Sequence, residues 1–153
     1  MYETFLILHS VLRWAVVAAG LYALALAATG MANRRPWTPK DLSAHRWFVI
    51  ALDVQFLVGL ILYGVVSPLV GGAMANMGEA MKSAPLRYWL VEHPLPMLVA
   101  LALVHLGFAR AKRTAATASH RHMLVHAGVA FVIILATTPW PFMTNGRPWL
   151  RIW

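Results

Sequence analysis

Four long apolar stretches run along the chain, and shorter polar or mixed connectors separate them. Each stretch reaches the length of about 20 residues that a helix needs to cross a bilayer. The hydrocarbon region offers no water to backbone amides and carbonyls, so each stretch is predicted to be a helix. The four predicted helices cover residues 4–29, 45–66, 86–109 and 123–140.

Basic residues gather in two connectors, 30–44 and 110–122. They are Arg34, Arg35, Lys40, Arg110, Lys112, Arg113 and Arg121. Each connector joins an odd helix to an even one, so both lie on one side of the membrane, and their positive charge predicts that this side is the cytoplasm. We therefore expect one all-α domain over residues 1–153, an integral membrane four-helix bundle. It is expected to run up-down-up-down in the bacterial inner membrane with both termini outside.

The middle connector, residues 67–85, is expected on the outer side. Its segment GGAMANMGEAMK places Met74, Met77 and Met81 at positions i, i+3 and i+7, which share one helical face. This spacing predicts a short helix that lies in the headgroup region with its apolar face toward the lipid. A methionine site for Cu(I) is the alternative, because thioethers suit this ion.

A faint internal similarity relates the second and fourth helices. The His-Arg pair at 45–46 aligns with the His-Arg pair at 120–121. His9 and His93 likewise lie near the outer ends of the first and third helices. Duplication of a helix pair produces such a pattern, so a 2+2 helix repeat is one interpretation.

Charged residues within the apolar stretches are expected to face the interior of the bundle and to pair with one another. With a helical rise of about 1.5 Å per residue, Arg13 lies about 13 Å below the outer boundary and Asp53 about 18 Å below it. Asp53 is therefore the predicted partner of Arg13, and Glu92 is the second choice. Gln55 lies slightly deeper than Asp53, near the midplane. Such a buried polar group either binds a ligand or only fixes the order of the helices.

The histidines fall into two layers. His9 and His93 lie about 7 Å and about 9–10 Å below the outer boundary, so we expect them at one level. The inner layer consists of His45, His105, His120, His122 and His126. Of these, His120 and His122 are predicted to lie among the headgroups.

Two prolines, Pro94 and Pro96, follow His93 in the third stretch. Because proline has no amide hydrogen, they predict a kink or a loosened first turn beside this histidine. Irregular backbone at membrane depth occurs where protein or a cavity covers it, so the surroundings of His93 are expected to be enclosed.

The composition excludes several classes of protein. Hydrophobic residues make up 60% of the chain and charged residues only 12%, which is more apolar than a soluble domain of 153 residues. There is no cysteine, which rules out disulfides, iron–sulfur clusters and thiol catalysis. The net charge of +8 is explained by the cytoplasmic connectors, and no nucleic-acid-binding motif is present. The first apolar stretch has no basic segment before it, so we expect a retained helix and not a signal peptide.

Histidine layers in a membrane bundle favour b-type haem, whose iron takes axial imidazoles. Helical bundles build such sites from side chains on facing helices. His9 and His93 are the predicted ligands of one iron. Arg13 and Arg87 are the predicted partners of the haem propionates, because a guanidinium pairs with a carboxylate through two hydrogen bonds.

A second iron would be held near the inner boundary by His105 together with His45 or His126. His93 and His105 are 12 residues apart on one helix, about 18 Å along its axis, which suits two haems stacked across a bilayer. The same spacing turns the two side chains about 120° apart, which counts against a two-haem arrangement. The competing interpretation is that the inner histidines are structural residues at the membrane border.

Several segments together resemble a family of small bacterial four-helix membrane proteins that are labelled cytochrome-b-like. The segments are LHSVLRW, LSAHRWF, LDVQFLVGLILY, RYWLVEHPLPMLVALALVHLG and ATTPWPF, and they cover most of the chain. The resemblance implies a four-span bundle and says little about chemistry.

Three functions fit these residues. The first is a b-type electron carrier between quinol and a partner, with haem held by histidines. The second is a cofactor-free accessory subunit of a larger respiratory or photosynthetic membrane complex, with the tail TNGRPWLRIW as its contact arm. The third is a protein that binds a quinone or another apolar ligand in an outer pocket, where Arg13 and Glu92 bind it or move protons.

Overall fold

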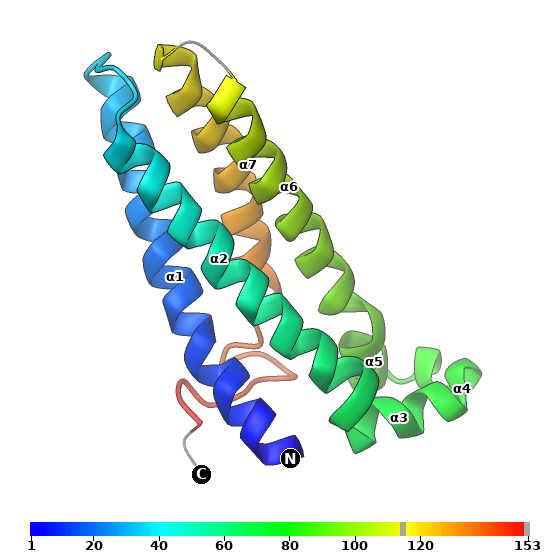
Figure 1. The fold of residues 1–153 in the computed structure, drawn as a ribbon. Coiled ribbons are helices and arrows are strands. Elements are labelled where there is room, and N and C mark those ends of the chain that lie inside the picture. Colours follow the sequence, from blue (N-terminus) through cyan, green and yellow to red (C-terminus); the bar gives the residue numbers. More distant parts are fainter. Residues whose placement is uncertain (114–115, 152–153) are drawn as a thin grey trace.

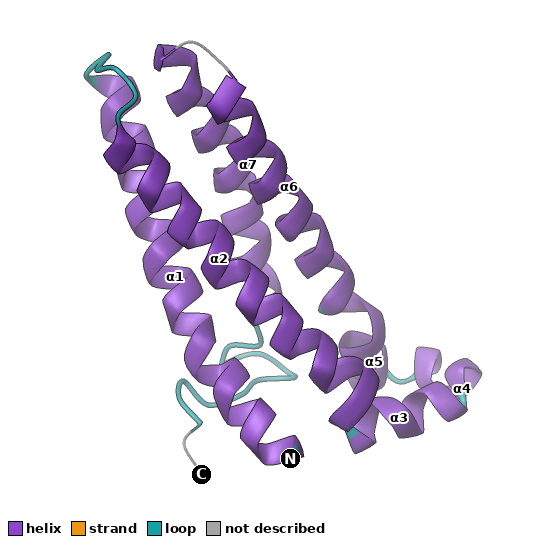
Figure 2. Ribbon diagram, in the orientation of Figure 1, coloured by secondary structure: helices purple, strands orange, loops and turns teal. Residues whose placement is uncertain are grey.

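A computed structural model describes residues 1–113 and 116–151 of the chain. Its regular elements are all helical, with no strand among the described residues (Figures 1 and 2). The long helices are α1 (Tyr2–Ala32), α2 (Pro39–Ile61), α6 (Pro94–Arg113) and α7 (Ala116–Thr137). The short elements are two π-helical turns, η1 (Leu62–Val66) and η2 (Tyr88–Glu92), and three helices, α3 (Pro68–Ala75), α4 (Met77–Lys82) and α5 (Ala84–Arg87).

Four segments of the described chain are long and apolar enough to cross a membrane. They are Tyr2–Ala32, Pro39–Val66, Ala84–Arg113 and Ser119–Thr137. The prediction of four membrane-length helices in an all-α protein is therefore confirmed.

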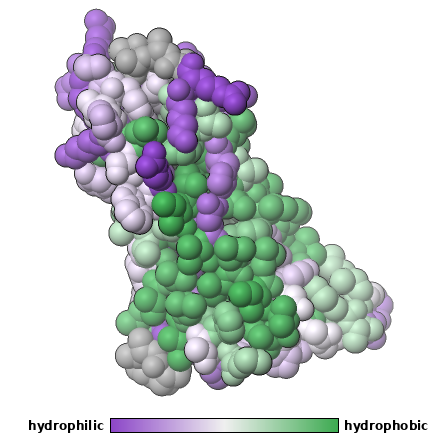
Figure 3. Space-filling view, viewed as in Figure 1, coloured by the Kyte–Doolittle hydropathy of each residue, from purple (hydrophilic) through white to green (hydrophobic). Residues whose placement is uncertain are grey.

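The surface agrees with contact to lipid. Figure 3 shows hydrophobic residues over the middle and lower parts of one face, and hydrophilic residues at its upper end, beside the connector between α1 and α2. Large apolar side chains such as Trp47, Leu57 and Val132 are exposed on the long helices. An extended apolar surface of this kind marks a contact with membrane or protein, and on helices of this length it is consistent with contact to lipid.

The four long helices lie side by side, and successive helices are joined at alternate ends (Figure 1). α1 packs against α2 and α7, and α6 packs against the same two helices. α1 and α6 therefore lie at opposite corners, as do α2 and α7. This diagonal arrangement decides which histidines can meet across the interior.

The start of α2 differs from the predicted start because of its cap. α2 begins at Pro39, where the carboxylate of Asp41 accepts a hydrogen bond from the backbone amide of Thr38 at 2.8 Å. Such a bond satisfies an amide that the first helical turn leaves unpaired. Asp41 also accepts from Arg35 at 2.6 and 2.7 Å, and these bonds raise the pKa of Arg35 above its usual value.

Both basic connectors are shorter than predicted. The first spans residues 33–38, because α1 continues to Ala32. α6 continues to Arg113 and α7 begins at Ala116, so the rest of the second connector lies outside the described residues. At its other end α7 stops at Thr137, earlier than the predicted residue 140.

The predicted irregularity beside His93 is confirmed. Residues Tyr88–Glu92 form the π-helical turn η2, in which the amide of His93 donates to the carbonyl of Tyr88 at 2.9 Å. The α-helical pattern resumes at Pro94. Single π turns of this kind are frequent at functional sites.

The middle connector does not form the single helix that its methionine spacing predicts. It folds into α3 and α4, which project sideways from the long helices (Figure 1). Asn76 separates them and caps α4 through its side chain. Met74 therefore lies on one short helix and Met77 and Met81 on the next, and all three are exposed. The prediction that the three methionines share one face of a single helix is wrong, and the copper site stays a prediction.

Small residues fill the interior where the long helices approach each other. The buried alanines of these helices are Ala23, Ala27, Ala44, Ala100, Ala111, Ala127 and Ala130. Small side chains let helix backbones pack closely within a membrane. Two aromatic rings, Phe48 of α2 and Phe131 of α7, meet edge to face at 6.2 Å beside Gly20 of α1.

Gly20→Ala tests this packing. A Cβ atom at residue 20 would lie 2.6 Å from Cε2 of Phe131 and 3.0 Å from Cε2 of Phe48, so the rings must shift. We expect the substitution to lower the free energy of unfolding in detergent by about 1–3 kcal/mol. Gly72→Ala in α3 is the matched control, because a Cβ there meets nothing within 4 Å. Equal stability losses in the two variants would contradict the packing described.

Candidate functional site

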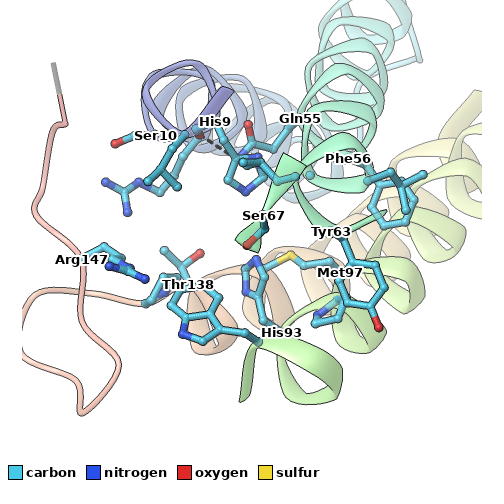
Figure 4. A pocket seen from close by; sticks show the side chains of 18 of the residues that line it. His9, Ser10, Gln55, Phe56, Tyr63, Ser67, His93, Met97, Thr138 and Arg147 are labelled. Atoms are coloured by element: carbon cyan, nitrogen blue, oxygen red, sulfur yellow. Dashed lines mark hydrogen bonds between the residues drawn. The ribbon is translucent and has the colours of Figure 1, made fainter. Parts of the chain in front are cut away.

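A cavity of about 180 Å³ lies at the end of the molecule that carries both chain termini, which we call the terminal end. It is lined by α1, α2, η1, α3, η2, α6, the end of α7 and the C-terminal segment 139–151 (Figure 4). Most lining side chains are apolar, as Val16, Leu52 and Met97 are. The polar and charged groups of the lining include His9, Arg13, Gln55, His93, Arg147 and Arg151.

Two histidines face each other across this cavity. His9 lies on α1 and His93 joins η2 to α6, and Figure 4 shows their rings pointing toward one another from opposite sides. The ring centroids are 6.4 Å apart and the ring planes cross at 80°. The structure thus brings together the two histidines that were expected at one level. Their role as metal ligands stays a prediction.

His93 is held by backbone and aromatic contacts. Its Nδ1 lies 2.9 Å from the carbonyl oxygen of Thr137, at the end of α7. The hydroxyl of Tyr88 donates to the same oxygen at 2.8 Å, and the rings of Tyr88 and Trp89 lie 5.8 and 5.9 Å from the histidine ring. A carbonyl oxygen only accepts hydrogen bonds, so Nδ1 of the neutral ring carries the hydrogen and Nε2 keeps a free lone pair.

His9 fits into the packing because residue 59 of α2 is a glycine. A Cβ at Gly59 would lie 3.1 Å from Cε1 of His9, closer than ordinary contact. The side-chain amide of Gln55 donates to the carbonyl of His9 at 3.1 Å and so ties α2 to α1. Nδ1 of His9 and Oε1 of Gln55 are buried and have no hydrogen-bond partner among the described residues. Buried polar atoms are usually paired, so this wall suits a polar ligand.

Arg13 anchors the C-terminal segment to α1. The residue is 8% exposed, and its Nη2 donates to the carbonyls of Pro148 and Trp149 at 3.0 and 2.6 Å. The indole of Trp14 donates to the Trp149 carbonyl at 2.8 Å. The tail that was predicted to be a contact arm for another subunit therefore packs on its own chain as far as Arg151. Residues 152–153 lie outside the described residues.

Three guanidinium groups border the cavity, and one of them has a carboxylate partner. Arg151 pairs with Glu3 at 2.6 Å. Arg147 lies over the ring of Trp89, 4.8 Å from its centroid. Neither Arg147 nor Arg13 forms an ion pair within residues 1–113 and 116–151. The cavity border therefore carries excess positive charge, which suits an anionic group.

The predicted pair of Arg13 and Asp53 is wrong. Oδ1 of Asp53 instead bonds Nε2 of His105 at 2.7 Å. The side chains of Asp53 and His105 are 38% and 49% exposed, so this pair faces outward between α2 and α6. Glu92, the second choice, pairs with Arg87 at 2.6 Å. Arg87 and Glu92 do not line the cavity among the described residues, so Arg87 is not placed to bind a propionate there.

His105 and His126, two of the inner histidines that were predicted to bind a second haem, have other hydrogen-bond partners in the structure. Nε2 of His105 is bound to Asp53. Both ring nitrogens of His126 are also engaged, Nε2 by Arg110 at 2.6 Å and Nδ1 by the carbonyl of His122 at 2.8 Å. His126 therefore has no free nitrogen for a metal, whereas His105 donates its Nε2–H to the carboxylate and keeps the lone pair of Nδ1. The inner haem stays a prediction.

His45 and His120, two members of the predicted inner layer, lie beside the same tryptophan. Both are fully buried at the end of the molecule opposite the terminal end, beside Trp37. His120 is buried within the protein, and its expected level among the headgroups stays a prediction. The region around these two residues is called the connector end below.

Sequence reasoning also missed two cavity residues, Arg147 and Arg151. Both lie in the C-terminal segment, which the accessory-subunit hypothesis treated as a contact arm. The signal that could have found them is the density of tryptophan and arginine in RPWLRIW, since such side chains rarely stay unpacked at a membrane surface.

Comparison of the chain with protein-family models, with curated proteins and with solved structures finds no match in any of the three. The geometry of the cavity alone indicates what it can hold. Facing imidazoles, arginines without carboxylate partners and apolar walls can hold a planar, anionic or metal-containing ligand away from water.

Arg13→Met should free the C-terminal segment. Each hydrogen bond from a charged group contributes about 1.5–3 kcal/mol, and the substitution removes two of them. The chain has no cysteine, so Leu150→Cys provides a single attachment site for a nitroxide spin label. We expect the label to be clearly more mobile when Arg13→Met is added.

Arg46→Met is the control for this experiment, because Arg46 is an exposed cation of α2 at the opposite end of the molecule. It should leave the mobility of the label unchanged. A label that is equally restrained with and without the Arg13 guanidinium would show that other contacts hold the tail.

Proposed function

We propose that the protein is a membrane electron carrier that holds one b-type haem in the cavity at its terminal end, with His9 and His93 as axial ligands. In this proposal the four long helices form an integral membrane bundle with alternating directions in a bacterial inner membrane. The basic connectors face the cytoplasm, and both termini lie on the outer side.

The facing pair of His9 and His93 carries the proposal. Bonds of about 2 Å from a metal to an imidazole nitrogen place the centroids of two opposed rings about 6 Å apart. The observed separation of 6.4 Å is close to that value. Ligating histidines normally donate their other ring N–H to a carbonyl or carboxylate, which fixes the ring. His93 makes such a bond with Thr137 and keeps Nε2 for the iron.

The charges around the cavity support an anionic ligand. A haem carries propionate groups, and Arg13 and Arg147 are guanidinium groups that border the cavity without an ion-pair partner in the described chain. These two arginines replace the predicted set of Arg13 and Arg87. Arg13 would then hold a propionate and the C-terminal segment at the same time.

The apolar walls would exclude water from the bound group. Val16, Leu52, Phe56 and Met97 line the cavity from three helices. When bound, haem supplies reversible one-electron transfer at a potential that depends on its axial ligands and surroundings. The contribution of the chain is to hold the iron, to neutralise the propionates and to keep the site dry.

The absorption spectrum of the purified full-length protein tests this proposal. Protein expressed with haem available should show a Soret band that shifts on reduction with dithionite. His9→Gln and His93→Gln should each lower haem occupancy by about tenfold or more, because second-shell losses alone cost about 10–100-fold in metal affinity.

His105→Gln is the matched control, because its ring bonds Asp53 outside the cavity. It should retain the wild-type spectrum. A folded, colourless wild-type protein, or unchanged spectra in both cavity variants, would contradict the haem proposal.

The size of the cavity favours a second candidate, a quinone or another single-ring apolar ligand. The cavity measures about 180 Å³, below the roughly 300–1,000 Å³ of typical ligand sites. A haem macrocycle therefore requires the walls to separate, whereas a single ring does not. Arg13 and Arg147 offer donors to a ring oxygen.

A short-chain ubiquinone is the probe for this second candidate. At about 100 times its Kd a bound ligand stabilises a protein by about 2.7 kcal/mol, which raises the unfolding temperature measurably. Arg13→Ala should lose this shift, and His105→Gln should keep it. If the protein shows a Soret band and ubiquinone does not change its unfolding temperature, the quinone is excluded and the haem is favoured.

A further inference from the structure

An aspartate–histidine pair lies on the outer face of the molecule between α2 and α6. Oδ1 of Asp53 bonds Nε2 of His105 at 2.7 Å, and the two side chains are 38% and 49% exposed. We propose that this face binds a second copy of the chain, so that the protein is a symmetric dimer in the membrane. The inference rests on the proposed membrane location of the long helices. It does not depend on the haem, because neither residue lines the cavity.

The pair lies too deep in the membrane to reach water. Asp53 is near the middle of the apolar segment Pro39–Val66, about 20 Å along the helix from either end. An aspartate side chain is short, so it does not extend to the headgroups as a lysine or an arginine does. Figure 3 views this face, and hydrophilic residues extend from its upper end into the hydrophobic region. A single chain in a bilayer therefore exposes a carboxylate and an imidazole to lipid.

Each member of the pair keeps one polar atom without a partner. Oδ2 of Asp53 and Nδ1 of His105 have no hydrogen-bond partner among the described residues. Hydrocarbon cannot supply one. Ionisable residues within a membrane almost always face protein or a water-filled cavity. A protein surface with matching polar groups is therefore the expected cover of this face.

The pair is complementary to itself, which points to a second copy as that cover. In a twofold-symmetric dimer, contact of residue i of one copy with residue j of the other implies contact of j with i. Asp53 of each copy can therefore meet His105 of the other. Protonation of Nδ1 makes the ring a donor through both nitrogens, Nε2–H to its own carboxylate and Nδ1–H to that of the other copy. Two carboxylates and two imidazolium rings then alternate, so that each buried charge is paired.

The residues around the pair permit the close approach of two copies. On α6 the exposed alanines Ala102 and Ala109 lie one turn to either side of the histidine. On α2 the exposed apolar residues Ile50 and Leu57 lie one turn to either side of the aspartate. Small side chains let helix backbones approach within a membrane, and polar side chains then bond across the contact. The face thus combines polar groups that need a partner with neighbours that do not obstruct one.

The oligomeric state of the full-length protein tests the proposal. Sedimentation equilibrium in a mild detergent compares wild type with Asp53→Leu, His105→Leu and the control Tyr22→Leu, in which an exposed residue of α1 is replaced. Leucine is well tolerated at lipid-facing positions, so the variants are expected to fold. We expect wild type to dimerise. Asp53→Leu and His105→Leu should each raise the Kd of the dimer by about tenfold or more, because symmetry removes two bonds between helices at once. Tyr22→Leu should leave the Kd unchanged.

Disulfide cross-linking in native membranes locates the contact. The chain has no cysteine, so a single introduced cysteine can link only to the same residue of a second copy. Ala102→Cys, beside the pair, should give a cross-linked dimer on oxidation. Leu21→Cys, at an exposed position in the middle of α1, should not. This measurement keeps Asp53 and His105 intact, so it decides the matter if the leucine variants fail to fold.

Wild-type protein that is monomeric and does not cross-link through Ala102→Cys overturns the proposal. A dimer that survives both leucine substitutions forms through another face and also overturns it. So does a complex with a different protein that Asp53→Leu disrupts, because the occupant is then not a second copy. The haem proposal is judged separately by the absorption spectrum, so the failure of either proposal leaves the other standing.

Discussion

The hydrocarbon region of a bilayer offers no partner to a polar group, and this constraint decides where the charged side chains of the long helices lie. Asp53 pairs with His105, and Glu92 with Arg87. Nη2 of Arg13 donates to backbone carbonyls of the C-terminal segment, whereas its Nε is buried without a partner among the described residues. The bonds of Arg13 determine the fold of the terminal end. The C-terminal segment must pack against α1 to make them, and in doing so it completes the wall of the cavity.

Hydropathy was sufficient to predict the four long helices, because length and apolarity are what spanning a bilayer requires. The helix ends were predicted less well, since each depends on individual hydrogen bonds. α2 begins early because Asp41 caps its first turn. The middle connector forms two helices because Asn76 ends one and caps the other. Such local bonds involve only three or four residues, and a hydropathy pattern read over about 20 residues does not reveal them.

Depth arithmetic placed His9 and His93 at one level but gave Arg13 the wrong partner. Helical rise gives the position of a residue along the helix axis. It does not give the direction in which the side chain points around that axis. His9 and His93 line the cavity, and Asp53 is turned outward, so level alone was sufficient for the first pair and misleading for the second. The actual partners of Arg13 are the backbone carbonyls of Pro148 and Trp149, 135 and 136 residues away, which a pattern of side-chain types does not record.

The two histidine pairs are seated in a similar way. In each pair one ring packs on a glycine of the neighbouring helix, Gly59 or Gly30, and the other lies against aromatic side chains. A glycine gives a planar ring room within a tight helix crossing. The ends differ in access, because the cavity is bordered by arginines whereas Trp37 covers the connector end. The cavity is therefore open to a ligand in the folded protein, whereas packing closes off His45 and His120.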